Sequence, residues 1–270
     1  MENTSTNFDT ALEALSNLSN NFTVSVPIFS TPQVLEFKEI NAKQQKELIQ
    51  SITDTSLYKV AFTKLFYTIL KENLLIQSFN IDQLTIFDKI IVGLYLRSKI
   101  SSKLNVIFQD NPIITEVIDL QKIINNISNY NHPTEFILKE IKNNIDLEIK
   151  ISVPIIKLEL EYEEELYKNY KKADDIKNVN EIGSIVSDAF IGEISKYISY
   201  IRFGNTEINL DTLTPKQRIK VTEKLTADII QKVLEKVSEW RQNLDKFLTV
   251  KHSENKLAKV LTIDNLLFLM

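Results

Sequence analysis

Residues 80–99, with the sequence NIDQLTIFDKIIVGLYLRSK, carry the strongest fold signal in this chain. Thr85 is the expected N-cap of a helix, with Asp88 three residues later in the capping-box position and at the positive end of the helix dipole. Apolar residues then recur at the spacing of one helix face, namely Phe87, Ile90, Ile91, Leu94 and Tyr95. The segment therefore predicts an amphipathic helix, with Phe87 and Leu94 in the core.

A β-hairpin followed by a helix is predicted upstream of this segment. Residues 22–28 alternate between apolar and polar types, as in a half-buried strand, and residues 34–40 form the return strand after a Ser-Thr-Pro turn. Pro27 has no N–H to donate to a ladder, which indicates an edge strand. Asn41 is then expected to cap a helix that carries Gln44 in the capping-box position. With helices over residues 57–75 and 80–99, this makes a compact bundle against a hairpin.

The middle of the chain predicts a small antiparallel sheet. Residues 104–108 and 114–120 have the pattern of a hairpin, and residues 125–131 that of a polar loop. The longest alternation runs over residues 145–162, and its phase slips by one residue at Pro154. We expect a β-bulge at Pro154, and two strands joined by a bend are the alternative.

Helices are predicted for most of the remaining sequence. A turn is expected at residues 203–206, and a helix begins at Thr214, where Pro215 and Gln217 complete the start signal. The other predicted helices cover residues 161–172, 181–200 and 227–248. Residues 261–270 are unusually apolar for a terminus, and they either pack onto the long helix or contact a partner.

Together these predictions define an α+β fold with an N-terminal β-hairpin and helical bundle, a small central antiparallel sheet and C-terminal helices. The expected order is a loose tail or short helix at residues 1–20, a hairpin plus bundle at 21–103, a β subdomain at 104–165 and a helical region at 166–270.

The composition disfavours several function classes. The 270 residues are 43% hydrophobic and 25% charged, and the net charge of −4 gives no electrostatic footprint for nucleic acid or an anionic membrane. The 4 glycines are dispersed, which disfavours a phosphate-binding loop, and the absence of cysteine excludes disulfides and thiolate metal sites. No apolar run is long enough to span a bilayer.

Candidate catalytic residues are few. His132 and His252 lie in polar stretches without a second metal ligand at a suitable spacing, which predicts solvated loop histidines. The acidic residues 161–165, with Asp174 and Asp175, are the most enzyme-like feature, because paired carboxylates can do acid–base work or hold a hard cation. Nearby lysines favour a solvated helix face with salt bridges instead. We therefore expect no catalytic, metal or cofactor site, and a carboxylate-dependent hydrolase is the alternative.

Two of these segments resemble the baseplate hub and hub-assembly proteins of T-even-like contractile-tailed phages. The similarity rests on FKEINAKQQK after the hairpin, and on LTIFD leading into a helix that ends in LRSK. It covers residues 21–167 and, more loosely, the C-terminal helices. Several relatives carry cysteine pairs suggestive of bound zinc in the hairpin that corresponds to residues 104–120. This chain has no cysteine there, so the resemblance does not imply a metal site in this hairpin.

The resemblance implies a non-enzymatic component of the baseplate hub that binds other hub and tail proteins. It places the protein in the virion tail baseplate or, during assembly, in the host cytoplasm, with neither nucleic acid nor membrane as a partner. The resemblance fits two roles, a permanent hub subunit and a transient assembly chaperone. If the resemblance is accidental, the alternative is a general α+β adaptor protein. The expected partner-binding residues are Arg97, Lys99, Leu266, Leu267 and Phe268. For the two cations, the alternative is stabilisation of the helix C-terminus by charge.

Overall fold

The computed structural model describes residues 10–11, 14–15, 22–53, 58–108, 114–129, 131–142, 144–174, 179–253 and 256–259. It contains both helices and antiparallel strands, which confirms the predicted α+β class. The chain forms two compact units, each built from separate stretches of sequence. Unit 1 comprises Met1–Ile81, Asp88–Asn129 and Leu248–Met270, and unit 2 comprises Asp82–Phe87 and Tyr130–Phe247. The consecutive domains expected at residues 21–103, 104–165 and 166–270 are therefore not the compact units of the structure.

Unit 1 contains the predicted N-terminal hairpin. β1 (Thr23–Pro27) pairs antiparallel with β2 (Val34–Lys38), and their alternate residues are buried. α2 (Ala42–Thr53) follows with the predicted capping box, because the Gln44 N–H donates to Asn41 Oδ1 at 2.9 Å and the Asn41 N–H donates to Gln44 Oε1 at 3.2 Å. These local predictions are confirmed.

Two further helices supply much of the core of unit 1. They are α3 (Tyr58–Asn73) and α4 (Ile86–Ile100), of which the part from Asp88 onward belongs to this unit. Asp88 Oδ1 accepts hydrogen bonds from the backbone N–H groups of Phe29 at 2.7 Å and Ser30 at 3.1 Å. This carboxylate therefore ties the start of α4 to the turn between β1 and β2.

Two more hairpins belong to unit 1. β3 (Lys103–Phe108) pairs with β4 (Ile114–Asp119), as predicted. β9 (Thr249–Ser253) pairs with β10 (Lys256–Lys259), and β10 lies beside β3. His252 is thus in a strand, so its assignment to a loop was wrong.

The polar loop predicted over residues 125–131 is also wrong for most of its length. α5 (Leu120–Ser128) occupies this stretch, and Asp119 caps it by accepting from the Gln121 N–H. The reason is the apolar face at helical spacing formed by Leu120, Ile123, Ile124 and Ile127, all of which are buried.

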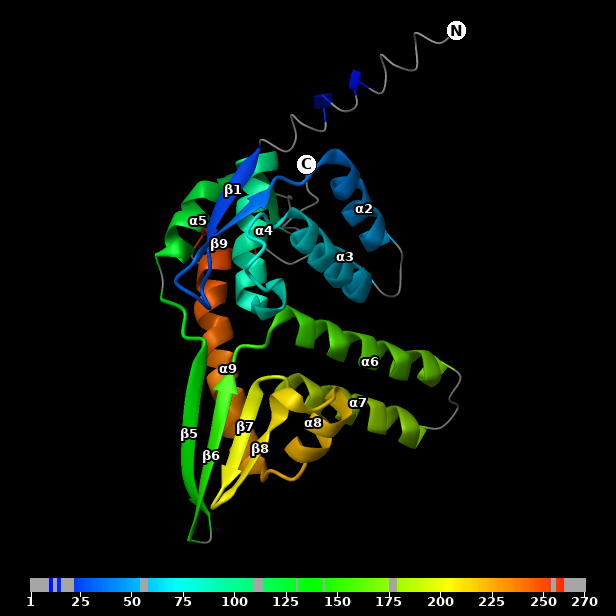
Figure 1. Ribbon diagram of the computed structural model, residues 1–270, viewed down its shortest axis with the longest axis vertical. Coiled ribbons are helices and arrows are strands. Elements are labelled where there is room, and N and C mark those ends of the chain that lie inside the picture. Colours follow the sequence, from blue (N-terminus) through cyan, green and yellow to red (C-terminus); the bar gives the residue numbers. More distant parts are fainter. Residues whose placement is uncertain are drawn as a thin grey trace. The chain divides into compact units, whose positions relative to one another are not determined.

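Unit 2 is built on a four-stranded antiparallel sheet in the order β5-β6-β7-β8 (Figure 1). Its strands are β5 (Glu135–Lys142), β6 (Ile145–Ser152), β7 (Ile198–Phe203) and β8 (Thr206–Asn209). Gly204 makes the predicted turn between the last two strands with a φ of +56°, a conformation that favours glycine.

The long helix α9 (Ala227–Leu248) lies along one face of this sheet, within the predicted bounds (Figure 1). Three side-chain contacts join α9 to β5: Lys232 pairs with Glu140, Asp228 pairs with Lys142, and the Lys236 ammonium lies 4.7 Å from the centre of the Phe136 ring. The core of unit 2 lies between them, with Ile149, Ile151, Ile201, Val233 and Trp240 buried.

The remaining helices of unit 2 are α6 (Ile156–Asp174), α7 (Val179–Ser195) and α8 (Pro215–Thr222), which pack on one another. α8 has the predicted capping box of Thr214 and Gln217. The helix predicted over residues 181–200 runs too far, because the chain turns after Ser195 and enters β7 at Ile198.

The prediction of a strand over residues 145–162 is right only for its first half. The strand β6 ends at Ser152, and α6 begins at Ile156, so neither a bulge nor a bend between two strands describes Pro154. The chain is anchored here on residues 84–86, because the Ile86 N–H donates to the Pro154 carbonyl at 2.9 Å and the Ile156 N–H donates to the Leu84 carbonyl at 2.8 Å. Among the described residues, no helix combines the length and apolar character needed to cross a bilayer.

Candidate binding groove

A groove of about 510 Å³ opens in unit 2 between the sheet and the segment that joins α8 to α9. The sheet contributes Leu147, Ile201, Phe203 and Ile208, and the helical side contributes Val221, Leu225, Thr226 and Ile229. Lys142, Lys220 and Lys224 complete the lining. The groove thus combines an apolar surface from several elements with three cationic side chains.

Two apolar side chains in the groove are open to solvent. Phe203 on β7 is 46% exposed and Ile208 on β8 is 38% exposed. In contrast, Ile201, which lies two residues before Phe203 and is paired with Ile208, is buried. Covering apolar surface contributes roughly 25 cal/mol per Å² removed from water. An open apolar groove with a polar rim is the usual mark of a binding surface.

Of the three lysines that line the groove, only one is paired with a carboxylate among the described residues. Lys142 pairs with Asp228, and the hydrogen bonds from Lys142 and Thr226 lower the pKa of Asp228 from 3.8 to about 2. Lys220 and Lys224 form no ion pair within the described part of the chain. This side of the groove is therefore basic.

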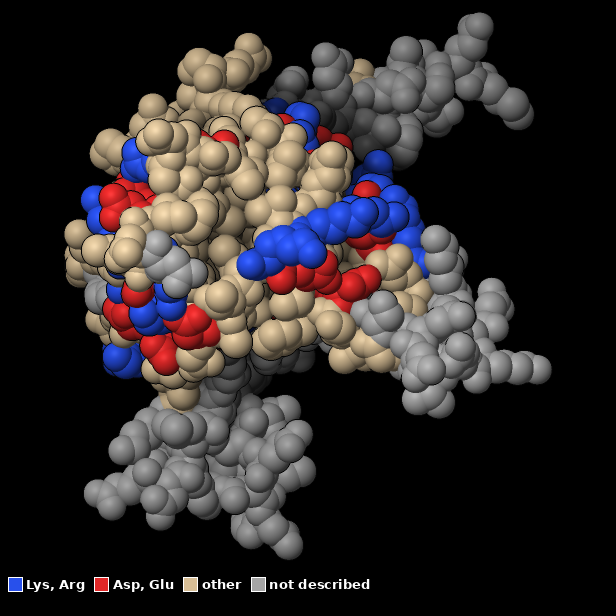
Figure 2. Space-filling model, turned by 90° about the horizontal axis from the view of Figure 1, so that it is seen from below, with Lys and Arg blue, Asp and Glu red and all other residues tan. Residues whose placement is uncertain are grey.

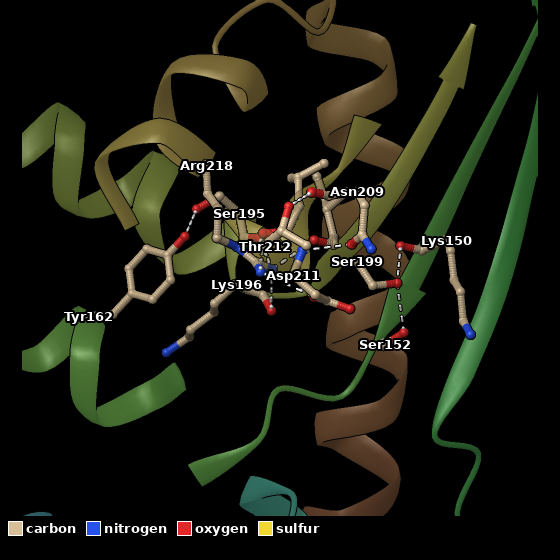
Figure 3. A network of polar contacts seen from close by, with 12 residues as sticks. Lys150, Ser152, Tyr162, Ser195, Lys196, Ser199, Asn209, Asp211, Thr212 and Arg218 are labelled. Atoms are coloured by element: carbon tan, nitrogen blue, oxygen red, sulfur yellow. Dashed lines mark hydrogen bonds and ion pairs between the residues drawn. The ribbon is translucent and has the colours of Figure 1, made fainter. Parts of the chain in front are cut away.

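Arg218 holds α8, and hence one wall of the groove, in place. Its side chain is buried at 1% exposure, and Nη2 donates to the carbonyls of Ser195 at 3.1 Å and Ile198 at 2.7 Å. Figure 3 shows it reaching from α8 toward the end of α7 and the start of β7. One guanidinium thus joins three elements.

The same side chain also joins α8 to the short helix η2 (Leu210–Thr212). Arg218 Nη1 donates to the Leu210 carbonyl at 3.0 Å and pairs with Asp211 Oδ1 at 3.2 Å (Figure 3). Since η2 directly follows β8, Arg218 fixes α8 relative to the strand that carries Ile208.

A buried hydroxyl pair lies next to this network. Tyr162 Oη and Ser195 Oγ are 2.5 Å apart (Figure 3). Ser195 Oγ also donates to the Gly192 carbonyl at 3.1 Å. Burial raises the pKa of Tyr162. The pair joins α6 to the end of α7, so its evident role is structural.

A second polar cluster joins α7 to α9. Glu193 pairs with Lys196 at 2.6 Å and with Arg241, and Arg241 Nη2 also donates to Tyr197 Oη at 2.9 Å. Burial acts to raise the pKa of Glu193, but Lys196 and Arg241 together bring it below its ordinary value. Glu193 is therefore an ionised link between two cations.

Arg97 and Lys99, two of the partner-binding residues predicted from sequence, do not line the groove. Arg97 is buried, burial lowers its pKa, and its Nη1 donates to the Ser101 carbonyl at 3.0 Å. Its guanidinium thus lies at the end of α4, as in the alternative of stabilising the helix C-terminus, and partner binding by Arg97 stays a prediction. Lys99 is exposed on α4 of unit 1. Leu266, Leu267 and Phe268 lie outside the described residues.

His132 is not the solvated loop residue that the sequence predicted. It is buried, and its ring lies edge-on to Phe87 and Phe247, with centroid distances of 6.5 and 6.0 Å. The polar residues around it in the sequence gave no sign of this, because both aromatic neighbours come from distant segments.

Acidic side chains of α6 form salt bridges with nearby lysines, as predicted. Glu161 lies 4.0 Å from Lys157, and Glu165 lies 3.0 Å from Lys216. Among the described residues, no three His, Asp or Glu side chains gather closely enough to hold a metal ion. The carboxylates of Asp174 and Asp175 lie outside the described side chains.

Comparison with known proteins gave no match to a family model, to a curated protein or to a solved structure.

Proposed function

We propose that this chain is a non-enzymatic component of the baseplate hub of a contractile-tailed phage, and that it binds other hub and tail proteins. The observation that carries the proposal is the open apolar groove of unit 2, with Phe203 and Ile208 exposed inside it. The resemblance over residues 21–167 supports the phage assignment.

The occupant that fits this groove is an apolar segment of another baseplate protein that also carries carboxylates. Its apolar side chains cover Phe203 and Ile208, and its carboxylates meet Lys220 and Lys224. Charge complementarity favours this occupant over an apolar segment without charge, because cationic side chains at an interface select and orient an acidic partner.

The proposal includes both a permanent hub subunit in the virion and a transient chaperone that acts in the host cytoplasm. Mass spectrometry of purified virions separates the two, since only a permanent subunit is present in the mature particle. Binding through the groove is common to both.

Retention of co-expressed hub proteins by the tagged full-length chain tests the proposal. Ile208→Asp puts a charge into the groove, and the pair Lys220→Glu with Lys224→Glu reverses its rim. Both variants are expected to lose the partner. Val186→Asp is the matched control, because Val186 is an exposed apolar residue on α7 outside the groove.

Two results would contradict the proposal. Failure of the unmodified chain to retain any hub protein removes the functional assignment. Equal retention by the Ile208→Asp and Val186→Asp variants removes the groove as the binding site. A chain that ends before residue 265 tests the separate expectation for Leu266, Leu267 and Phe268.

A further inference from the structure

The sheet of unit 2 has one long regular edge. β5 has 8 residues, whereas β8 at the other edge has 4. β5 pairs with β6 without a register shift, and among the described strands none pairs with its outer side (Figure 1). Natural proteins keep exposed edges short, bulged or covered, because free backbone groups recruit another strand.

The direction of the free backbone groups follows from the pairing with β6. The Val153 N–H donates to the Thr134 carbonyl at 2.9 Å, and hydrogen-bonding alternates from residue to residue in an antiparallel ladder. The N–H and C=O groups of Glu135, Ile137 and Lys139 therefore point away from β6. They are the groups that an added strand would bond.

The side chains of the same three residues lie on one face of the sheet. Ile137 is 46% exposed, and Ile141 farther along the strand is 70% exposed. Glu135 and Lys139 stand two residues on either side of Ile137 and carry opposite charges. A strand that carried the same residues in the reverse direction would match this pattern.

We propose that β5 pairs antiparallel with β5 of a second copy of this chain, around a two-fold axis at Ile137. In this arrangement Ile137 faces its counterpart, and Glu135 of each copy faces Lys139 of the other. The two-fold symmetry makes both ion pairs equivalent and joins the two sheets into one.

Charge selects this register among the possible ones. A two-fold axis at Lys139 places two lysines opposite each other, and an axis at Leu138 places each charge opposite an isoleucine. Among the side chains of residues 135, 137, 139 and 141, only an axis at Ile137 makes opposite-charge pairs, which stabilise directly opposed positions on paired strands.

The two charged side chains are accessible for this contact. Glu135 pairs with Lys150 and Lys139 pairs with Glu148 within the sheet, yet their side chains are 61% and 73% exposed. The proposal does not depend on the groove, since β5 residues other than Lys142 are not part of its lining.

The mass of the full-length chain in solution, measured by sedimentation over a wide concentration range, tests the pairing. The unmodified chain is expected to dimerise. Glu135→Lys alone and Lys139→Glu alone each turn two opposite-charge pairs into like-charge pairs, so each is expected to raise the dimer Kd by about tenfold or more. An equal mixture of the two variants regains both opposite-charge pairs and is expected to form a heterodimer.

The mixture separates an effect on pairing from an effect on folding, because any folding defect of a single variant persists in the mixture. Glu207→Lys on β8 is the matched control and should leave the mass unchanged. Ile137→Pro removes an outward N–H and should abolish the dimer, with circular dichroism as the check on folding.

Three results would each overturn the proposal: an unmodified chain that is monomeric at every concentration, single variants that dimerise as tightly as the unmodified chain, or a mixture that stays monomeric. A chain that is monomeric alone but captures an extended peptide would assign the edge to another protein.

Discussion

Arg218 is a cation in the interior of unit 2, and its surroundings explain why it is tolerated there. Its Nη1 and Nη2 donate to backbone carbonyls at the end of α7, the start of β7 and the start of η2, and Asp211 supplies a countercharge. The sequence around it, PKQRIK, is that of an exposed short helix. Its main partners are backbone carbonyls, which every residue has, so no sequence pattern identifies them.

Replacing Arg218 with Met should lower the free energy of unfolding by about 3–5 kcal/mol, because buried carbonyls and Asp211 lose their donor. Arg218→Lys keeps the charge but not the planar fork, and an intermediate loss is expected. Urea unfolding followed by circular dichroism measures both. A loss under about 1 kcal/mol for Arg218→Met, similar to that of an exposed control such as Lys224→Met, would show that the network is not a stabilising contact.

Asp228 predicts a pH dependence of stability. Its pKa is lowered to about 2 in the folded chain, so its contribution is fully present above its ordinary pKa of 3.8 and is lost as the pH falls through about 2. The difference in urea midpoint between the unmodified chain and Asp228→Asn should be constant above pH ~5 and should shrink as the pH approaches ~2. A difference that does not change between these pH values would contradict the assignment.

The helix α4 illustrates how an element can be predicted from its own residues. The apolar spacing placed Phe87 and Leu94 in the core, and both are buried. Caps are equally local, which is why those of Asn41 and Thr214 were found. Such signals lie within a few residues of one another and do not depend on tertiary structure.

Phe87→Ala should therefore lower the free energy of unfolding by about 3–5 kcal/mol, the usual effect of truncating a buried aromatic side chain. Phe190→Ala, at an exposed position of α7, is the matched control and should change stability by less than about 1 kcal/mol. Thermal unfolding of both variants checks the prediction. Equal stability of the two would place Phe87 outside the core.

The errors at element level have physical causes. Apolar residues at 156, 158, 160 and 162 alternate as in a strand, yet 156 and 160, like 158 and 162, also stand one helical turn apart. Alternation over such a short stretch fits both a strand and a helix. In the structure β6 ends at Ser152, and the stretch forms the start of α6. The groove was missed for a different reason: Ile201, Val221 and Ile229 come together only through tertiary packing, and no sequence pattern reports which apolar residues stay exposed.

At the scale of the molecule, basic and acidic side chains are mixed. Figure 2 shows Lys and Arg next to Asp and Glu on the face that it displays. In unit 2, basic and acidic side chains form ion pairs, such as that of Lys232 with Glu140. The net charge of −4 does not favour the attraction of a phosphate backbone to the molecule.

Duplex DNA should therefore bind with a Kd weaker than about 10⁻⁴ M at physiological salt, which is at or below the range of ordinary non-specific binding. Fluorescence anisotropy with a labelled duplex measures this. Micromolar binding that weakens steeply as salt is added would show that a basic surface does exist.

The interleaving of the two units along the chain has a consequence for biosynthesis. The main segment of unit 2, Tyr130–Phe247, is translated before the last segment of unit 1. β3 is translated early, but the strand that lies beside it, β10, comes near the end of the chain. The sequence of unit 2 is therefore complete in the nascent chain before that of unit 1. The unit whose sequence begins the chain is thus the last to be finished, and a nascent chain halted at Phe247 contains all of unit 2 beside an unfinished unit 1.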